Sequence, residues 1–284
     1  MSHPESSKNK NQYKKSGYLE SDFKLFHLRD SFPQTFDFHY HDFHKILIFL
    51  DGNVSYIVEG RQYDLRPFDM LLIGAGEIHK PVIHTAASYE RIILYLSPRF
   101  FTENSSPDAD LFYCFQAVKA RQSCLIRVKD MAHSPLIHIA KELPSTVQNG
   151  EFGSMLYQRT KLFEYLILLN RTVLNEQADY STPVTAHPVV LSIMEYINNH
   201  ITEDLSIDTI AGSMFLNRSY MMHLFKAETG YTIGKYITEK RLFLTGQYRK
   251  QGLCVTEACY KSGFKNYASY YHAYHKKYRT LSNI

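Results

Sequence analysis

The C-terminal third of the chain contains the segment IDTIAGSMFLNRSYMMHLFK, residues 207–226. A second segment, VTEACYKSGFKNYASYYHAY at residues 255–274, repeats its pattern. The two copies correspond at an offset of 48 in their first half, where Ala211 matches Cys259, and at an offset of 49 in their second half, where His223 matches His272. An internal repeat of this length predicts two copies of one supersecondary unit.

Each copy has the pattern of a helix-turn-helix. Gly263 stands where a tight turn needs a glycine, and Asn217 and Asn266 can cap the helices that follow. Residues expected to face inward are Ile207, Ile210, Ala211, Met214, Met221, Leu224 and Phe225 in the first copy, and Val255, Ala258, Cys259, Tyr270 and Tyr274 in the second. Small residues among them allow the second helix to cross the first closely.

The opposite face of each second helix is left free for a partner. It carries Arg218, Ser219, Met222, His223 and Lys226 in the first copy, and Tyr267, Ala268, Ser269, His272, His275 and Lys276 in the second. Hydrogen-bond donors near a helix N-terminus, with cations beside them, suit the major groove of DNA.

The charge distribution supports a polyanionic partner for this region. Residues 185–284 hold 12 Lys and Arg against 7 Asp and Glu, whereas the rest of the chain holds 20 against 21. A basic module joined to a neutral one is typical of a nucleic-acid-binding protein, although the excess is small.

Residues 187–284 resemble the DNA-binding domain of the AraC/XylS family of transcription regulators. The matches are Leu224-Phe225-Lys226, Glu228-Thr-Gly230, the segment 236–242 with Arg241, and Gly263-Phe264. The resemblance implies that a connecting helix, about residues 234–250, holds both recognition helices on one face of double-stranded promoter DNA, about 34 Å apart. It also implies base contacts from Ser219, Met222, His223, Tyr267, Ala268, Ser269 and His272. Arg218 and Lys226 are expected to contact phosphates.

The sequence departs from this family pattern in three ways. Gly246 lies inside the connecting helix, where it costs about 1 kcal/mol relative to Ala. The chain after Tyr278 lacks the Gly and Pro that usually follow the last helix. The positions expected to contact bases also include no Arg or Gln, the residues that read bases most readily, so an ordinary solvated face is the alternative for their tyrosines and histidines.

The N-terminal part has the pattern of a β-rich domain. Short apolar runs at 46–50, 54–58, 61–65, 70–73 and 91–96 are separated by turns such as Asp51-Gly52-Asn53, which predicts a sandwich or barrel. Residues 21–97 resemble the cupin-type sensor barrel of many AraC-family regulators. The fold class is therefore α+β: a cupin-like barrel, then helices, then an all-α double helix-turn-helix domain.

Three further segments complete the predicted organisation. Residues 1–20 have the polar composition of a disordered tail. Within the helical region 98–174, the segment 155–174 predicts an amphipathic helix with a wide apolar face, which either forms a homodimer interface or packs on its own barrel. Residues 175–186 lose this periodicity and predict a linker.

The barrel carries histidines at positions where metal-binding cupins hold their ligands. His39 and His41 form the HxH pair and His79 is the later histidine, but Lys45 occupies the glutamate position. A cation there repels a metal ion, so we expect no metal or other cofactor, although a site of three histidines remains chemically possible. We expect His39, His41 and His79 to contact an effector instead.

Other functional classes fit less well. The segment 1–15 lacks the apolar stretch of a signal peptide, the longest apolar runs are far too short for a membrane span, and the four cysteines form no metal-binding spacing. We therefore expect a cytoplasmic transcription activator that responds to a small, sugar-like effector. We expect this protein to bind DNA, a second copy of itself and RNA polymerase, and to have no enzymatic activity. The alternatives are a metal-dependent cupin enzyme with a DNA-binding tail and a ligand-independent DNA-binding protein.

Overall fold

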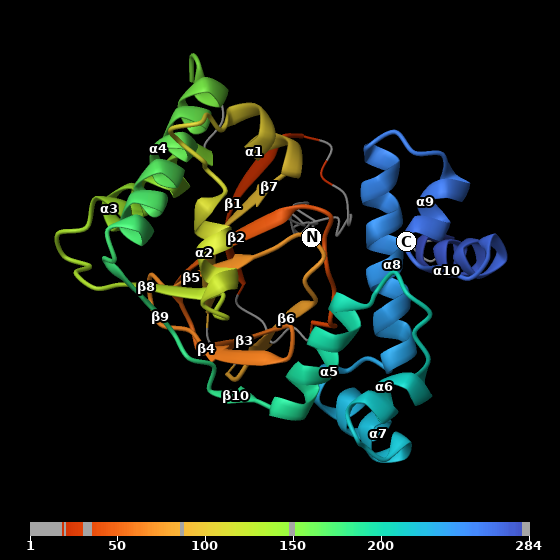
Figure 1. The fold of residues 1–284 in the computed structure, drawn as a ribbon. Helices are drawn as coiled ribbons and strands as arrows, with labels where there is room; N and C mark the ends of the chain where they lie inside the picture. The colour runs from red at the N-terminus through yellow and green to blue at the C-terminus, as the bar shows by residue number, and fades with distance from the viewer. Residues whose placement is uncertain (1–18, 20, 31–35, 86–87, 148–150, 280–284) are drawn as a thin grey trace, which may run out of the picture.

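The computed structural model describes residues 19, 21–30, 36–85, 88–147 and 151–279, and the predicted disordered tail lies almost entirely outside them. The strands are β1 (Phe23–Asp30), β2 (His44–Asp51), β3 (Val54–Val58), β4 (Arg61–Asp64), β5 (Met70–Ile73), β6 (His79–Ile83), β7 (Tyr89–Leu96), β8 (Leu125–Val128), β9 (Ala178–Tyr180) and β10 (Thr185–Ala186). A sheet-rich N-terminal domain followed by helices confirms the predicted fold class (Figure 1).

Two antiparallel sheets build the N-terminal domain. The larger has the strand order β1-β7-β2-β5-β8-β9, and the smaller has the order β10-β4-β3-β6. Strand β2 lies in the middle of the larger sheet and is buried on both faces, because its side chains alternate between two cores. Leu47 packs with Tyr56 and Tyr63 of the smaller sheet, whereas Ile46 packs against the helices on the outer face. This explains the continuous apolar run that predicted a strand.

Four helices and a 3-10 turn follow the first seven strands and cover the outer face of the larger sheet. They are α1 (Pro98–Asn104), α2 (Tyr113–Ala120), α3 (Pro135–Glu142), the turn Leu143–Val147 and α4 (Ser154–Leu174). In α4, Leu162 and Leu166 are fully buried in the core of their own domain. The central apolar face of this helix is therefore not a free dimer interface, and the alternative of packing on its own domain is confirmed.

The predicted division of the chain near residue 97 and the predicted linker 175–186 need correction. Strand β8 lies inside the region expected to be helical, and β9 and β10 lie inside the expected linker. β9 pairs with β8, and β10 pairs with β4. Sheet pairing over such long sequence distances leaves little periodicity in strands of two to four residues, so the local pattern did not reveal them.

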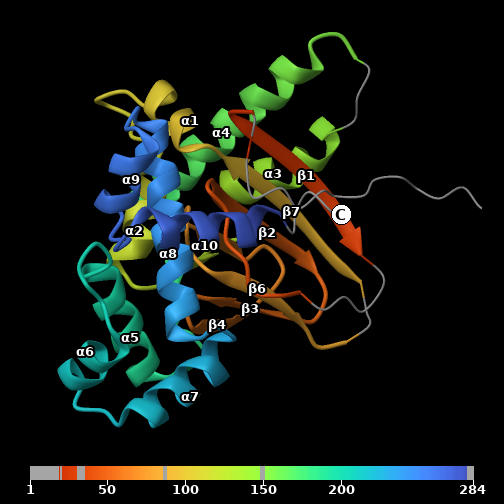
Figure 2. The same ribbon diagram turned by 90° about the vertical axis from the view of Figure 1, so that its right-hand side faces the viewer.

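The C-terminal part consists of helices alone. They are α5 (Pro188–Asn199), α6 (Ile207–Ser213), α7 (Arg218–Thr229), α8 (Ile233–Lys250), α9 (Val255–Lys261) and α10 (Tyr267–Arg279). In Figures 1 and 2, the long helix α8 runs between the N-terminal domain and the pair α9–α10, with α6 and α7 near its first turn. Among the described residues, no helix combines the length and the hydropathy that a membrane crossing requires.

Candidate DNA-binding surface and effector site

The first helix-turn-helix consists of α6 and α7. Asn217 caps α7 by accepting hydrogen bonds from the backbone N–H groups of Ser219 and Tyr220, as expected of an N-cap asparagine. Met221 and Phe225 are fully buried and Leu224 is half-buried, so the predicted inward face is confirmed. These contacts fix which side of α7 faces outward.

The outward side of α7 carries every residue predicted for DNA contact from this copy. Arg218, Ser219, Met222, His223 and Lys226 are all exposed. Arg218 donates to Asp208 of α6 at 3.1 Å, so its guanidinium has an acidic partner that a phosphate would have to replace. The turn before α7 takes a positive φ of 53° at Phe215, a residue that is 97% exposed.

The second helix-turn-helix consists of α9 and α10, and helix α8 connects it to the first. Gly263 has φ +89°, and a Cβ there would lie 2.6 Å from the carbonyl oxygen of Ile201, which explains the glycine of the second turn. Asn266 caps α10 by accepting from the N–H of Ser269. Tyr270 is buried, but Tyr274 is 40% exposed, so the predicted burial of Tyr274 is wrong.

The outward side of α10 likewise carries the predicted residues. Tyr267, Ala268, Ser269 and His272 are exposed. Arg241 of α8 donates to the backbone oxygens of Ile201 and Glu203 and thereby ties the connecting helix to the loop after α5. Both recognition helices are thus held on one long helix with their candidate faces open.

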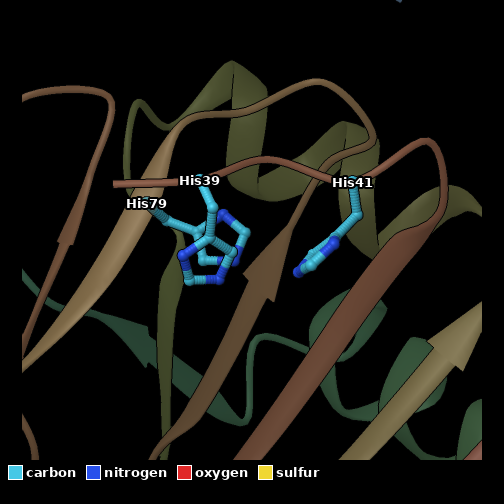
Figure 3. Close-up of side chains that lie close together, drawn as sticks. All are labelled: His39, His41 and His79. Carbon is cyan, nitrogen blue, oxygen red and sulfur yellow. The ribbon is translucent and has the colours of Figure 1, made fainter. Parts of the chain in front are cut away.

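The three histidines of the N-terminal domain form a cluster. His39 and His41 lie just before β2, and His79 begins β6, so the main chain brings them together through the bridge between residues 39 and 79. One ring nitrogen from each histidine lies within 4.8 Å of one ring nitrogen from each of the other two, and Figure 3 shows the three rings on the same side of the backbone. The structure therefore brings together the residues that the sequence predicted for the effector site.

The surroundings of this cluster are apolar and carry a buried cation. His41 stacks on Phe43 with ring centroids 4.5 Å apart. Lys45 is buried and donates to the hydroxyl of Tyr56 at 2.7 Å. Burial lowers the pKa of His79 well below its usual value, and the Lys45 cation adds to the shift, so His79 is neutral near pH 7.

A cleft of about 990 Å³ lies between the N-terminal domain, including its helix α2, and the helices α5 and α8. Glu59, Arg61, Glu77, Gln116 and Lys240 contribute polar groups to its lining. Burial, followed by the charge of Glu59, raises the pKa of the Glu77 carboxyl. Sequence reasoning assigned no binding role to these residues, because nothing in their local pattern indicates that distant segments meet there.

Comparisons with known proteins agree with this architecture. Residues 23–134 match the model of the AraC-like ligand binding domain, and residues 210–281 match that of a helix-turn-helix domain. The chain is 23% identical over 234 residues to the HTH-type transcriptional activator RhaS of Enterobacter sp. (strain 638), covering 82% of this chain and 81% of that protein. It is 40% identical over 91 residues to an uncharacterized HTH-type transcriptional regulator in the cgkA 5′ region of Pseudoalteromonas carrageenovora, covering 31% and 52%.

The fold also shows a similarity to the solved structure of ToxT from Vibrio cholerae, at 14% identity and a TM-score of 0.35, covering 92% of this chain and 99% of that chain. The curated relatives are named as regulators rather than enzymes. An N-terminal and a C-terminal segment of the chain match family models, one for ligand binding and one for a helix-turn-helix. The chain belongs to the AraC family and is a DNA-binding transcription regulator with an N-terminal ligand-binding domain.

Proposed function

We propose that this regulator activates transcription by binding promoter DNA through α7 and α10 in successive major grooves. The exposure of all nine predicted contact residues on these helices supports this assignment. Ser219, Met222 and His223 read bases in one groove, and Tyr267, Ala268, Ser269 and His272 read bases in the next. Arg218 and Lys226 contact phosphates, which position the protein without reading sequence.

The effector acts at the boundary between the two domains. The observation that carries this proposal is that Glu59 and Lys240 line the interdomain cleft and also contact each other across it. A ligand in the cleft touches both domains and changes how firmly they are held together. The cleft lies within the size range of small-molecule sites, and its polar lining suits a hydroxyl-rich, sugar-like effector, with the histidine cluster as a second effector contact.

The regulator works in the cytoplasm as a homodimer that contacts RNA polymerase. Support for self-association comes from the exposed apolar residues around the start of α4, namely Phe152, Met155 and Leu156. This patch lies apart from the buried residues of the same helix, so substitutions there test the dimer without disturbing the core. Met155→Glu should convert a dimer to a monomer in sedimentation experiments at micromolar concentration, and a wild-type monomer would refute the dimer.

The test of DNA binding uses the full chain and a library of random duplexes, from which bound sequences are selected and read. Selected DNA should bind with an affinity that falls steeply with salt, because phosphate neutralisation releases counterions. Lys226→Ala should weaken binding. Lys129→Ala serves as the matched control, because it also removes one exposed cation, which lies just after β8 and pairs with Asp179 of β9. Failure to select any sequence would refute the proposal.

The test of effector binding is a thermal-shift screen of sugars and related metabolites on the same protein. A true effector stabilises the folded state by about 2.7 kcal/mol at a hundredfold excess over its dissociation constant. Lys240→Met should remove this stabilisation, and Lys250→Met, outside the lining of the cleft, should retain it. DNA binding with no effector in an exhaustive screen would favour the ligand-independent alternative.

A further inference from the structure

We propose that His39, His41 and His79 bind one divalent first-row transition metal ion, and that this ion governs how residues 37–42 hold the DNA-binding domain. From the sequence alone we expected no metal, because Lys45 replaces the glutamate of metal-binding cupins. The arrangement of the three imidazoles leads to the opposite conclusion. The regulatory part of this inference rests on the proposed function, whereas the metal site does not.

The hydrogen bonds of two histidines orient them as metal ligands. The Nδ1 of His39 lies 2.8 Å from the carbonyl oxygen of Asp37, and the Nδ1 of His79 lies 2.9 Å from that of Glu77. A carbonyl oxygen can only accept, so each Nδ1 carries the proton and each Nε2 keeps its lone pair. A backbone carbonyl on the second ring nitrogen is the usual arrangement for a metal-bound histidine.

The remaining nitrogen of His79 points to a missing ligand. Its Nε2 is buried and has no hydrogen-bond partner among the described residues, although burying a polar atom without a partner costs free energy. A metal ion accepts this lone pair directly. An anion would instead need an N–H donor at Nε2. A neutral imidazole has only one N–H, and in His79 that group is at Nδ1, where it donates to the carbonyl oxygen of Glu77.

The donor set selects a class of metal. Three imidazoles with an open fourth position suit Zn²⁺, Fe²⁺, Co²⁺ or Ni²⁺, whereas Mg²⁺ and Ca²⁺ require oxygen ligands. Lys45 weakens the site by electrostatic repulsion, because its ammonium group is buried nearby and bonds to Tyr56. This repulsion lowers the affinity but removes none of the three nitrogens.

The segment that supplies two of the ligands also holds the DNA-binding domain. Its alternate residues point the other way: Tyr231 of the DNA-binding domain donates to the carbonyl oxygen of Phe38 at 2.7 Å, and the hydroxyl of Tyr40 donates to the carbonyl oxygen of Glu239 at 3.0 Å. Asp42 pairs with Lys250 at 2.6 Å. The side chains of His39 and His41 thus belong to the metal site, whereas those of Phe38, Tyr40 and Asp42 contact the DNA-binding domain.

Metal binding would tighten this segment. Two nitrogens bound tetrahedrally to one zinc ion lie about 3.3 Å apart, whereas the three candidate ligand nitrogens of the cluster, one per histidine, lie within a wider limit of 4.8 Å of one another. Closing the three rings around an ion therefore pulls on the backbone that carries Phe38, Tyr40 and Asp42. The backbone movement caused by a bound ion would therefore reach α8 through the contacts of Tyr40 and Asp42 with that helix.

The metal site is tested on the full chain freed of metal with a chelator and then dialysed. Titration with ZnCl₂ followed by calorimetry should show one ion per chain, and CoCl₂ should produce the visible absorption of tetrahedral cobalt. His39→Asn and His79→Asn should each weaken binding at least tenfold, whereas the exposed His138→Asn should not. Lys45→Glu should tighten binding at least tenfold, an outcome that misfolding cannot produce.

Absence of a stoichiometric ion, or equal affinities of the His39→Asn, His79→Asn and His138→Asn proteins, would overturn the metal site. The regulatory part is tested by hydrogen exchange of residues 37–42 and 230–250 with and without Zn²⁺, which should slow exchange in both segments. Unchanged exchange with a bound ion would overturn the coupling and leave the site standing. DNA binding measured in the same metal-free sample separates either failure from a failure of the proposed function.

Discussion

Glu59 of the β3–β4 turn and Lys240 of α8 form an ion pair of 2.8 Å whose side chains are only 13% and 14% exposed. The Glu59 carboxylate also accepts from the hydroxyl of Tyr236 and from the N–H of Ile78. One carboxylate therefore joins the ligand-binding domain to the helix that carries both recognition helices. Substituting Glu59 or its partners therefore changes contacts of both domains at once.

Removing one partner of this pair should destabilise the protein. Lys240→Met keeps the apolar stem but leaves Glu59 without its cation, which should lower the free energy of unfolding by roughly 2–3 kcal/mol. Chemical denaturation measures the change. The matched control is Lys250→Met, because its pair with Asp42 is 54% exposed on the lysine side and should cost about 1 kcal/mol or less. Equal losses would show that the buried pair has no special role.

The two recognition helices should contribute unequally to specificity. His223→Ala should flatten the base preference in the first groove at a cost of about 1–3 kcal/mol, and Lys226→Ala should weaken all sequences alike. We expect His272→Ala to have the mildest effect on specificity, because Gly246 loosens the connection to the second copy. Binding of the three variants across a randomised operator library at fixed salt measures the ranking. A stronger relaxation by His272→Ala than by His223→Ala would reverse it.

Substitutions in the turns of the two helix-turn-helix units should change stability in opposite directions. Gly263→Ala should destabilise strongly, because its Cβ would lie 2.6 Å from a backbone oxygen. Phe215 occupies the corresponding turn with φ +53° and is 97% exposed, so Phe215→Gly should stabilise by about 1 kcal/mol through relief of backbone strain. Thermal unfolding of the two variants distinguishes these effects, and a destabilising Phe215→Gly would mean that its ring makes contacts that outweigh the strain.

Gly246→Ala should also stabilise the protein. Apart from its chain neighbours and the backbone of its own helix turn, no atom of the described residues lies within 4 Å of the Cβ that this change would add, and alanine gains about 1 kcal/mol over glycine inside a helix. If the looseness of α8 limits the second recognition helix, the variant should bind selected DNA more tightly as well. Denaturation and DNA titration on the same sample separate the two results, since greater stability with unchanged affinity would contradict the link to DNA binding.

The protein should lose stability in mild acid because of the buried imidazole of His44. Burial lowers its pKa from about 6.5 to about 4, and its Nδ1 accepts from the N–H of Ala75. Between these pH values the unfolded chain takes up a proton that the folded chain does not. Stability is therefore full above pH 6.5 and falls as the pH drops toward 4, by about 3 kcal/mol in total.

The comparison of wild type with His44→Asn isolates this contribution, because the asparagine oxygen can replace Nδ1 as acceptor but does not titrate. Denaturation at a series of pH values should show a shallower slope for the variant between pH 6.5 and 4. Parallel slopes would exclude His44 as the source.

The amino-acid sequence by itself determined the elements whose physical cause is local. The helix-turn-helix pairs followed from apolar periodicity, from caps such as Asn217 and from the glycine demanded by the turn at Gly263, because each is decided within a few residues. The shared direction of the His39 and His41 rings was also foreseen, since an HxH spacing on extended backbone places both rings on one face.

Only the tertiary structure decided the relationships between distant segments. The pairing of β9 and β10 with strands far earlier in the chain, the burial of Leu162 in its own domain and the contact of Glu59 with Lys240 all depend on which surfaces meet. The alternation along residues 37–42 shows the same division: the sequence determined that odd and even side chains point apart, and the fold decided that one side meets His79 and the other meets α8. Local backbone preferences fix the direction of a side chain, whereas its partner is chosen by packing over the whole chain.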